Sequence, residues 1–196
     1  MRFVHNKILT LTLIGLLATT AASSFAHQDE ELDPQELIVL TIERGDINQI
    51  EQLFTAGLDI NQDIAGDGTP LIIAVRSGNK ELVKYLITQG ADVNVESTRD
   101  GTALTEAAAN NNVELLNYLH QQGAAIDTVT LYDETALITA SRAGSFQAVK
   151  YLVEQGADVN LAVEANVRFG KELRSPLNGA KTKQIRDYLI SQGARS

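Results

Sequence analysis

The stretch GTPLIIAVRSGNKELVKYLITQGADVN, residues 68–94, carries start and stop signals for two short helices. Thr69 and Pro70 begin the first helix, because a Thr side chain accepts hydrogen bonds from free backbone amides and Pro suits the first helical position. Asn79 is a favourable cap for the second helix, and Gly90 ends it because Gly adopts the left-handed conformation without steric cost. The stretch therefore predicts a helix–turn–helix unit.

This unit is copied along the chain with a constant period, which the step from Gly57 to Gly90 defines as 90 − 57 = 33. The glycine that ends the second helix recurs at Gly57, Gly90, Gly123 and Gly156, and Gly193 follows after a slightly longer step. The helix caps keep the same period, at Thr69, Thr102 and Thr135 for the first helix and at Asp46, Asn79, Asn112 and Ser145 for the second. Short helix pairs of this kind bury their apolar faces against neighbouring pairs, so the period predicts a stack of repeats.

The last copy departs from the period. Ser175, Pro176 and Leu177 repeat the start signal of a first helix, which predicts a shortened helix there. The step from Asn160 to Ser175 is nearly twice as long as the equivalent step from Asn94 to Thr102. Residues 161–174 are therefore predicted to form an extended finger.

The motifs at the two ends of the unit resemble the ankyrin repeat. The resemblance is carried by Gly-Thr-Pro-Leu at 68–71 and by Gly-Ala-Asp-Val-Asn at 90–94, an ending that returns at 156–160. It covers residues 34–195. Ile72, Thr105 and Ile138 stand where the family usually has His. The first copy lacks the Thr-Pro-Leu start, as a terminal capping repeat with a polar outer face would.

The resemblance implies an all-α fold, an ankyrin-repeat solenoid of about five helix–turn–helix repeats joined by β-turn fingers. The repeat domain is expected to span residues 34–196. Its repeats are predicted at residues 34–66, 67–99, 100–132, 133–169 with the extended finger, and 170–196 as a capping repeat.

Residues 1–26 are predicted to be a secretory signal peptide that is cleaved after Ala26. They combine a basic start, an apolar stretch over residues 8–18 and small residues before the cleavage point. A membrane anchor is the alternative, but the apolar stretch is shorter than the roughly 20 residues that a span needs. An acidic linker at residues 27–33 follows. The processed protein is expected to be periplasmic or secreted, without stable membrane insertion.

Charge and cysteine content exclude several classes of function. The chain has 16 Lys and Arg against 25 Asp and Glu, a net charge of −9, and cleavage of the signal removes two bases to leave 14 − 25 = −11. A field of this sign repels nucleic acid and anionic membranes. The sequence has no Cys, which excludes disulfides, thiolate metal sites and Cys nucleophiles.

Candidate catalytic and metal-binding residues have simpler structural explanations. His120 lies near a helix end, where a His interacts favourably with the helix dipole, and neither it nor His27 has a neighbouring motif that supplies a catalytic partner. Asp67, Asp100 and Asp133 recur with the period of the repeat. Carboxylates on helices about 8–10 Å apart cannot share an ion that needs ligands at about 2.5 Å. These residues, together with Asp59, Asp92 and Asp158, are interpreted as turn residues.

The family resemblance implies that a partner is recognised by positions that vary between repeats, on the finger tips and on the inner helices of the concave face. These candidate positions are Arg76, Ser77, Asn110 and Arg142 on the helices and Thr98, Arg99, Leu131 and Tyr132 on the fingers, with Glu134 beside a cap. Arg and Tyr are enriched at interface hot spots, and a row of Arg on an acidic protein would attract a carboxylate-bearing patch. The alternative is that each Arg is solvated or paired within its own surface.

Arg168 and Phe169 in the long finger are further candidates, because an apolar ring in a loop needs a partner or a fold-back contact. The sequence thus predicts a monomeric, cofactor-free periplasmic module that binds a folded protein partner. More specific roles are inhibition or immunity towards a secreted enzyme, or protection of a stress enzyme, which the resemblance to some bacterial ankyrin-like proteins suggests. The other classes that stay open are an enzyme using Asp133 and Glu134 and a self-associating scaffold.

Overall fold

The computed structural model describes residues 33–64, 66–98, 101–167 and 170–195. The predicted signal peptide, its cleavage point and nearly all of the predicted linker lie outside these residues. The chain divides into two compact units, one ending at Ala91 and one beginning at Asp92. Within the described ranges, no helix combines the length and apolar character needed to cross a membrane.

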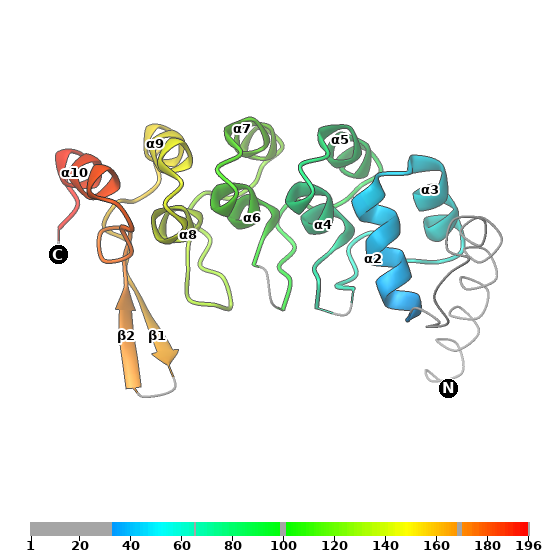
Figure 1. The fold of residues 1–196 in the computed structure, drawn as a ribbon, viewed down its shortest axis with the longest axis horizontal. Helices are drawn as coiled ribbons and strands as arrows, with labels where there is room; N and C mark the ends of the chain where they lie inside the picture. Colours follow the sequence, from blue (N-terminus) through cyan, green and yellow to red (C-terminus); the bar gives the residue numbers. More distant parts are fainter. Residues whose placement is uncertain (1–32, 65, 99–100, 168–169, 196) are drawn as a thin grey trace, which may run out of the picture. The chain divides into compact units, whose positions relative to one another are not determined.

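The first unit contains two helix pairs (Figure 1). Its helices are α2 (Pro34–Arg44), α3 (Ile47–Thr55), α4 (Pro70–Arg76) and α5 (Lys80–Thr88). The predicted caps of α4 and α5 are confirmed: Thr69 accepts a hydrogen bond from the Ile72 amide at 3.3 Å, and Asn79 accepts one from the Leu82 amide at 3.0 Å. The first repeat uses the same device with a different residue, because Asp33 caps α2 directly before Pro34.

The second unit contains five helices and a hairpin among its described residues (Figure 1). They are α6 (Ala103–Ala109), α7 (Val113–Gln121), α8 (Ala136–Ala143), α9 (Phe146–Glu154), β1 (Val163–Val167), β2 (Gly170–Arg174) and α10 (Lys183–Ser191). Ser145 precedes α9 as predicted, but its side chain makes no capping hydrogen bond. Figure 1 shows the inner helices α6 and α8 in one row, next to the fingers, and the outer helices α7, α9 and α10 in a second row.

The core of the second unit is built from residues at equivalent positions of successive repeats. Leu104 of α6 and Leu137 of α8 lie one period apart, as do Leu119 of α7 and Leu152 of α9, and all four are buried. α6 packs on α8, and α7 on α9. Burial of a Leu side chain stabilises the fold by about 1.5–3 kcal/mol. Each repeat therefore gains stability from the neighbour that covers it.

The period-marking glycines have the predicted backbone conformation, with φ between 91° and 103° at all five positions. Asn residues at the end of the repeat connect neighbouring repeats. Asn94 donates a hydrogen bond to the Gly123 carbonyl at 3.1 Å and accepts one from the Ala125 amide at 3.0 Å. Asn160 makes the equivalent pair of bonds with the next repeat, at 3.2 Å and 2.9 Å.

The last repeat differs from the prediction. Residues 176–179 form a single turn closed by the Gly179 amide on the Ser175 carbonyl at 2.9 Å, so the predicted first helix does not form. Asn178 and Gly179 have low helix propensity, and the Lys181 amide donates to the Ser141 carbonyl of α8 at 3.1 Å instead of continuing a helix.

The extended finger predicted at residues 161–174 contains the antiparallel hairpin β1–β2, in which Val163 pairs with Arg174 and Val167 with Gly170. This hairpin is the strand element that distinguishes the long finger from the β-turn fingers of the other repeats. The rest of the described fold is helical, as predicted.

Candidate functional site

Two of the predicted recognition residues lie in the first unit, at the end of α4. The Arg76 Nη2 atom donates to the Asp67 carbonyl at 2.9 Å, and the Ser77 hydroxyl donates to the Ala74 carbonyl at 2.9 Å. Both side chains thus form hydrogen bonds within their own repeat. Arg99, Arg168 and Phe169 lie outside the described residues, and the remaining candidates belong to the second unit.

The finger that joins α7 to α8 presents apolar side chains on a fixed backbone. Leu131 is 71% exposed and Tyr132 42% exposed at its tip. The Leu131 amide donates to the Glu96 carboxylate, and the Tyr132 hydroxyl donates to the Thr98 carbonyl, so both residues are tied to the preceding finger. The turn between them and α8 is closed by the Thr130 amide on the Glu134 carbonyl at 2.9 Å.

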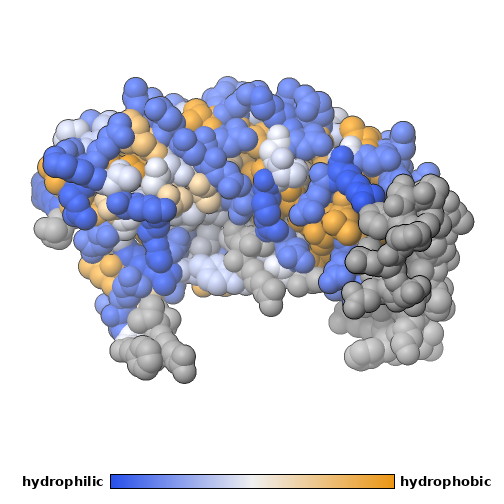
Figure 2. All heavy atoms as spheres, viewed as in Figure 1, coloured by the Kyte–Doolittle hydropathy of each residue, from blue (hydrophilic) through white to orange (hydrophobic). Residues whose placement is uncertain are grey.

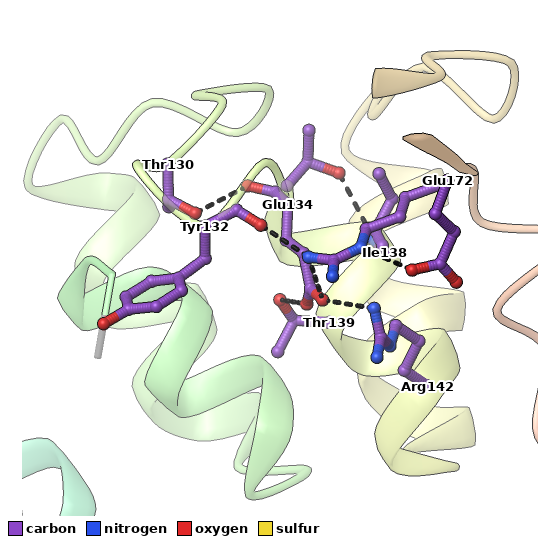
Figure 3. Close-up of polar contacts among 9 residues, drawn as sticks. Thr130, Tyr132, Glu134, Ile138, Thr139, Arg142 and Glu172 are labelled. Carbon is purple, nitrogen blue, oxygen red and sulfur yellow. Dashed lines mark hydrogen bonds and ion pairs between the residues drawn. The ribbon is translucent and has the colours of Figure 1, made fainter. Parts of the chain in front are cut away.

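Glu134 is the centre of a polar cluster (Figure 3). Its Oε1 atom accepts hydrogen bonds from Arg142 Nη1 at 2.6 Å and from Arg174 Nη1 at 3.3 Å, and its Oε2 atom accepts one from the Thr139 hydroxyl at 3.0 Å. Arg174 Nη1 also donates to the Tyr132 carbonyl at 2.6 Å. We call Glu134, Thr139, Arg142 and Arg174 the Glu134 cluster; it joins the finger, α8 and β2.

Local sequence explains how the Glu134 cluster assembles. Glu134 comes one residue before Thr135, which caps α8, and Arg142 lies in the last turn of that helix. Arg174 ends β2 and comes one residue before Ser175, so it has the same position in its repeat as Glu134 has in the preceding one. Equivalent positions of stacked repeats lie side by side. Arg174 was not among the predicted residues, although the opposite charges of Glu134 and Arg174 at one repeat position indicate such a pair.

Two clefts adjoin the Glu134 cluster. The α8–β2 cleft has a volume of about 360 Å³, and we use that name for the space lined by Ile138, Arg142, Glu172, Leu173, Arg174 and Lys181, among others. The α6–α8 cleft, of about 410 Å³, is lined by residues that include Thr105, Glu106, Tyr132, Glu134 and Arg174. Glu172 and Lys181 were also not predicted, because Glu172 lies in the inserted finger and Lys181 follows the turn of residues 176–179, where the repeat pattern is broken.

Some of the predicted recognition residues line these clefts or lie beside them. Arg142 lines the α8–β2 cleft, and one of its nitrogens is paired with Glu134. The sequence left open that each Arg is paired within its own surface, and for Arg142 this pairing is present. Asn110 ends α6 and donates to Glu106 Oε1 at 3.0 Å beside the α6–α8 cleft. The Tyr132 ring points away from Glu134 (Figure 3).

Of the residues considered for catalysis, His27 lies outside the described residues, and the others lie in helix ends, turns or ion pairs. His120 lies in the last turn of α7, with Nδ1 3.4 Å from the Ala124 carbonyl. Asp133 occupies a turn with φ of 55°, and Glu134 is paired with two arginines. Asp59, Asp92 and Asp158 each accept a hydrogen bond from the amide two residues ahead, as the turn interpretation predicts.

In the part of the chain that the structure describes, no three His, Asp or Glu side chains form a group able to hold a metal ion. Hydrophobic residues on the face seen in Figure 2 form separate patches among predominantly hydrophilic ones. The exposed large apolar side chains of the second unit include Val129, Leu131, Tyr132 and Leu173, of which Tyr132 lines the α6–α8 cleft and Leu173 the α8–β2 cleft.

Comparison with known proteins agrees with the repeat architecture. A family model described as ankyrin repeats (3 copies) matches the chain at residues 12–97, 37–130 and 71–163. The three overlapping matches together include every helix from α2 to α9. A search of curated proteins finds no match.

Proposed function

Because the chain belongs to the ankyrin repeat family, whose stacked helix pairs generally serve protein–protein interaction, we propose that it is an exported module that binds a folded partner protein. The binding surface is the side of the second unit formed by the inner helices α6 and α8, the Tyr132 finger (residues 127–134) and the hairpin β1–β2. Export is supported by the signal-like pattern of residues 1–26.

The observation that carries this proposal is the fixed display of apolar side chains on the Tyr132 finger. Leu131 and Tyr132 are exposed, yet the Leu131 amide, the Tyr132 hydroxyl and the Tyr132 carbonyl are all hydrogen-bonded to neighbouring segments. Ordering a loop on binding costs free energy, and a finger already held in place avoids that cost. Burial of a Tyr and a Leu against a partner then contributes directly to affinity.

The partner is taken to be a secreted or periplasmic enzyme that the bound chain inhibits or protects. In this proposal the chain binds no cofactor, and it is a monomer until the partner binds. Light scattering of the purified processed chain at micromolar concentration tests the monomer, and the activity of the captured enzyme with and without the chain distinguishes inhibition from protection.

Capture of the partner from a periplasmic and secreted protein extract tests the surface. The double substitution Leu131→Ala, Tyr132→Ala is expected to reduce capture by about tenfold or more, because truncation of an aromatic hot spot typically costs about 2 kcal/mol or more. Ile190→Ala is the matched control, since Ile190 is 53% exposed but lies on the outer helix α10.

Both variants keep the buried core, which circular dichroism should show as an unchanged helix content. If the double variant and the control capture the partner as well as the unmodified chain does, the Tyr132 finger is not the binding surface.

A further inference from the structure

The α8–β2 cleft has a charge opposite to that of the whole protein. Its charged lining residues are three cations, Arg142, Arg174 and Lys181, and one carboxylate, Glu172. The chain as a whole carries a net charge of −9. The α6–α8 cleft has the reverse balance, with Glu106 and Glu134 against Arg174. Glu134 pairs with Arg142 and Arg174, and with it the balance at the α8–β2 cleft is three cations against two carboxylates. A ligand that enters this cleft therefore still meets a local excess of positive charge on an acidic protein.

The cations of the α8–β2 cleft keep hydrogen-bonding capacity. Arg142 uses Nη1 on Glu134, and Arg174 uses Nη1 on Glu134 and on the Tyr132 carbonyl and Nε on Glu172. Lys181 Nζ donates to the Ala143 carbonyl at 3.2 Å. Guanidinium and ammonium groups carry more N–H donors than these bonds use within the described structure. The remaining donors are available to a ligand in the cleft.

Two of these cations have side-chain stems that lie close to a glycine, although both residues are exposed. A Cβ atom at Gly179 would lie 2.7 Å from Arg142 Cγ, so only Gly lets the Arg142 stem pass this close to the turn of residues 176–179. A Cβ atom at Gly144 would lie 3.2 Å from Lys181 Cδ. Side chains held by packing lose less conformational entropy when they bind a ligand. These contacts restrict the stems of Arg142 and Lys181 beside the cleft.

An apolar surface adjoins the cations. Leu173 is 55% exposed on β2, and the buried Ile138 forms part of the cleft wall. A planar carboxylate pairs well with a guanidinium, whereas the overall negative field disfavours nucleic acid. An acidic residue next to an apolar one, on an extended segment, offers both kinds of contact.

We propose that the α8–β2 cleft receives an Asp or Glu side chain of the partner protein, with a neighbouring apolar residue of the same segment against Leu173. This inference rests on the proposed function and specifies the chemistry of the partner. The carboxylate binds the remaining donors of Arg142, Arg174 and Lys181.

The test is a titration of the processed full-length chain with two blocked peptides, acetyl-Gly-Leu-Glu-Leu-Gly-amide and its Gln counterpart. The arginine side-chain N–H resonances report on binding by NMR. The Glu peptide is expected to shift the Nε–H resonances of Arg142 and Arg174 with a dissociation constant on the order of 1 mM. The Gln peptide should bind about tenfold more weakly, and added salt should weaken the Glu peptide because exposed ion pairs are screened.

Charge-matched variants locate the binding. Arg142→Gln combined with Lys181→Gln should weaken the Glu peptide by about tenfold or more, since both changes remove donors of the cleft. The control is Arg186→Gln, an equal charge change per residue at an exposed position of α10. Gly179→Ala keeps every charge but displaces the Arg142 stem, so it should weaken the Glu peptide as well.

The inference would be overturned if the Glu and Gln peptides bound equally well. It would also be overturned if Arg186→Gln weakened the Glu peptide as much, per charge removed, as Arg142→Gln combined with Lys181→Gln does. It would also fall if inorganic phosphate shifted the same resonances at lower concentration than the Glu peptide. The partner-capture test is independent of these results: if the Tyr132 finger variant loses the partner while the Glu peptide does not bind, only the carboxylate inference fails. If the peptide binds and no partner depends on the finger, only the proposed function fails.

Discussion

Ser141 of α8 has a buried hydroxyl without a hydrogen-bond partner in the described structure. The equivalent residue of the preceding repeat is Ala108, which is also buried, so the fold already accommodates Ala at this position. Ser141→Ala is expected to raise the free energy of unfolding by about 1 kcal/mol, because it removes an unsatisfied buried polar group. Urea unfolding followed by circular dichroism measures the change.

Ser145→Ala is the control for this prediction. The Ser145 hydroxyl is part-buried and donates to the Ala109 carbonyl at 2.7 Å, so its removal should lower the free energy of unfolding by about 1 kcal/mol. A loss of stability in Ser141→Ala similar to that in Ser145→Ala would show that the Ser141 hydroxyl is satisfied in solution.

Asp127 occupies the position at which Asn94 and Asn160 connect neighbouring repeats. Its carboxylate accepts from the Asp158 amide at 3.2 Å, but a carboxylate has no N–H to donate to the carbonyl that Asn would reach, that of Gly156. Asp127→Asn should supply this bond and raise the free energy of unfolding by about 0.5–1.5 kcal/mol. Thermal unfolding measures the gain, and the reverse change Asn160→Asp should lower the melting temperature; a fall with Asp127→Asn contradicts the prediction.

The residue-scale features that sequence predicted are those fixed by local chemistry. The caps at Thr69 and Asn79 and the turn role of Asp158 follow from interactions within a few residues, so the pattern alone was enough. The pair of Glu134 and Arg174 instead joins positions far apart in the chain, across an inserted finger. To predict this pair from the sequence, one must align the last repeat with the preceding one across the inserted finger.

At the scale of elements, the difference between local and long-range interactions explains why a first helix was predicted in the last repeat but does not form. Ser175 and Pro176 predict a helix start, but a start signal does not fix how far the helix runs. Asn178 and Gly179 follow at once, and the Lys181 backbone bonds to α8. The hairpin β1–β2 was predicted only as an extended finger, because its sequence has no two-residue turn signal of the kind that marks hairpins.

Arg174 is expected to anchor the hairpin β1–β2 to the rest of the second unit. An isolated two-stranded hairpin is marginally stable in water, and Arg174 links β2 to both Glu134 and the Tyr132 carbonyl. Arg174→Ala should therefore reduce the hydrogen-exchange protection of the strand amides by about tenfold, while amides of α7 keep theirs.

Lys171→Ala provides the comparison for this prediction. Lys171 forms an ion pair with Glu164 at 2.7 Å, but both side chains are about two-thirds exposed, at 68% and 65%. Exposed ion pairs contribute about 0–1 kcal/mol, so the strand amides should change little. Equal loss of protection in the two variants would mean that Arg174 is not the anchor.

At the scale of the whole molecule, the repeat period was the most informative feature of the sequence. It predicted the helix pairs α4–α5, α6–α7 and α8–α9, because these pairs share buried Leu positions, but not the loss of the first helix in the last repeat. The repeat period says less about which surface residues form the binding site. Leu131 and Tyr132 were identified by their variation between repeats, whereas the cations of the α8–β2 cleft come from three separate segments that only the folded chain brings together.

The outer helices carry a Tyr at one repeat position in both units, Tyr85, Tyr118, Tyr151 and Tyr188. Burial raises the pKa of Tyr85, Tyr151 and Tyr188 above the ordinary value of 10.0, and Glu51 beside Tyr85 and Glu154 beside Tyr188 add to the effect. The folded chain thus holds these phenol protons more tightly than the unfolded chain does. The stability that they contribute is fully present below about pH 10 and is lost as the pH rises through the raised pKa values.

The melting temperature is therefore expected to fall with pH above about pH 10, where the unfolded chain ionises first. Tyr151→Phe combined with Tyr188→Phe removes two of the three shifted groups and should make this fall less steep. Leu131→Ala removes no ionisable group and serves as the control. Calorimetry from about pH 8 to about pH 11 gives the slopes for the three proteins. A double variant whose slope equals that of the unmodified chain would show that the alkaline loss of stability arises elsewhere, since linkage requires the slope to follow the number of protons released on unfolding.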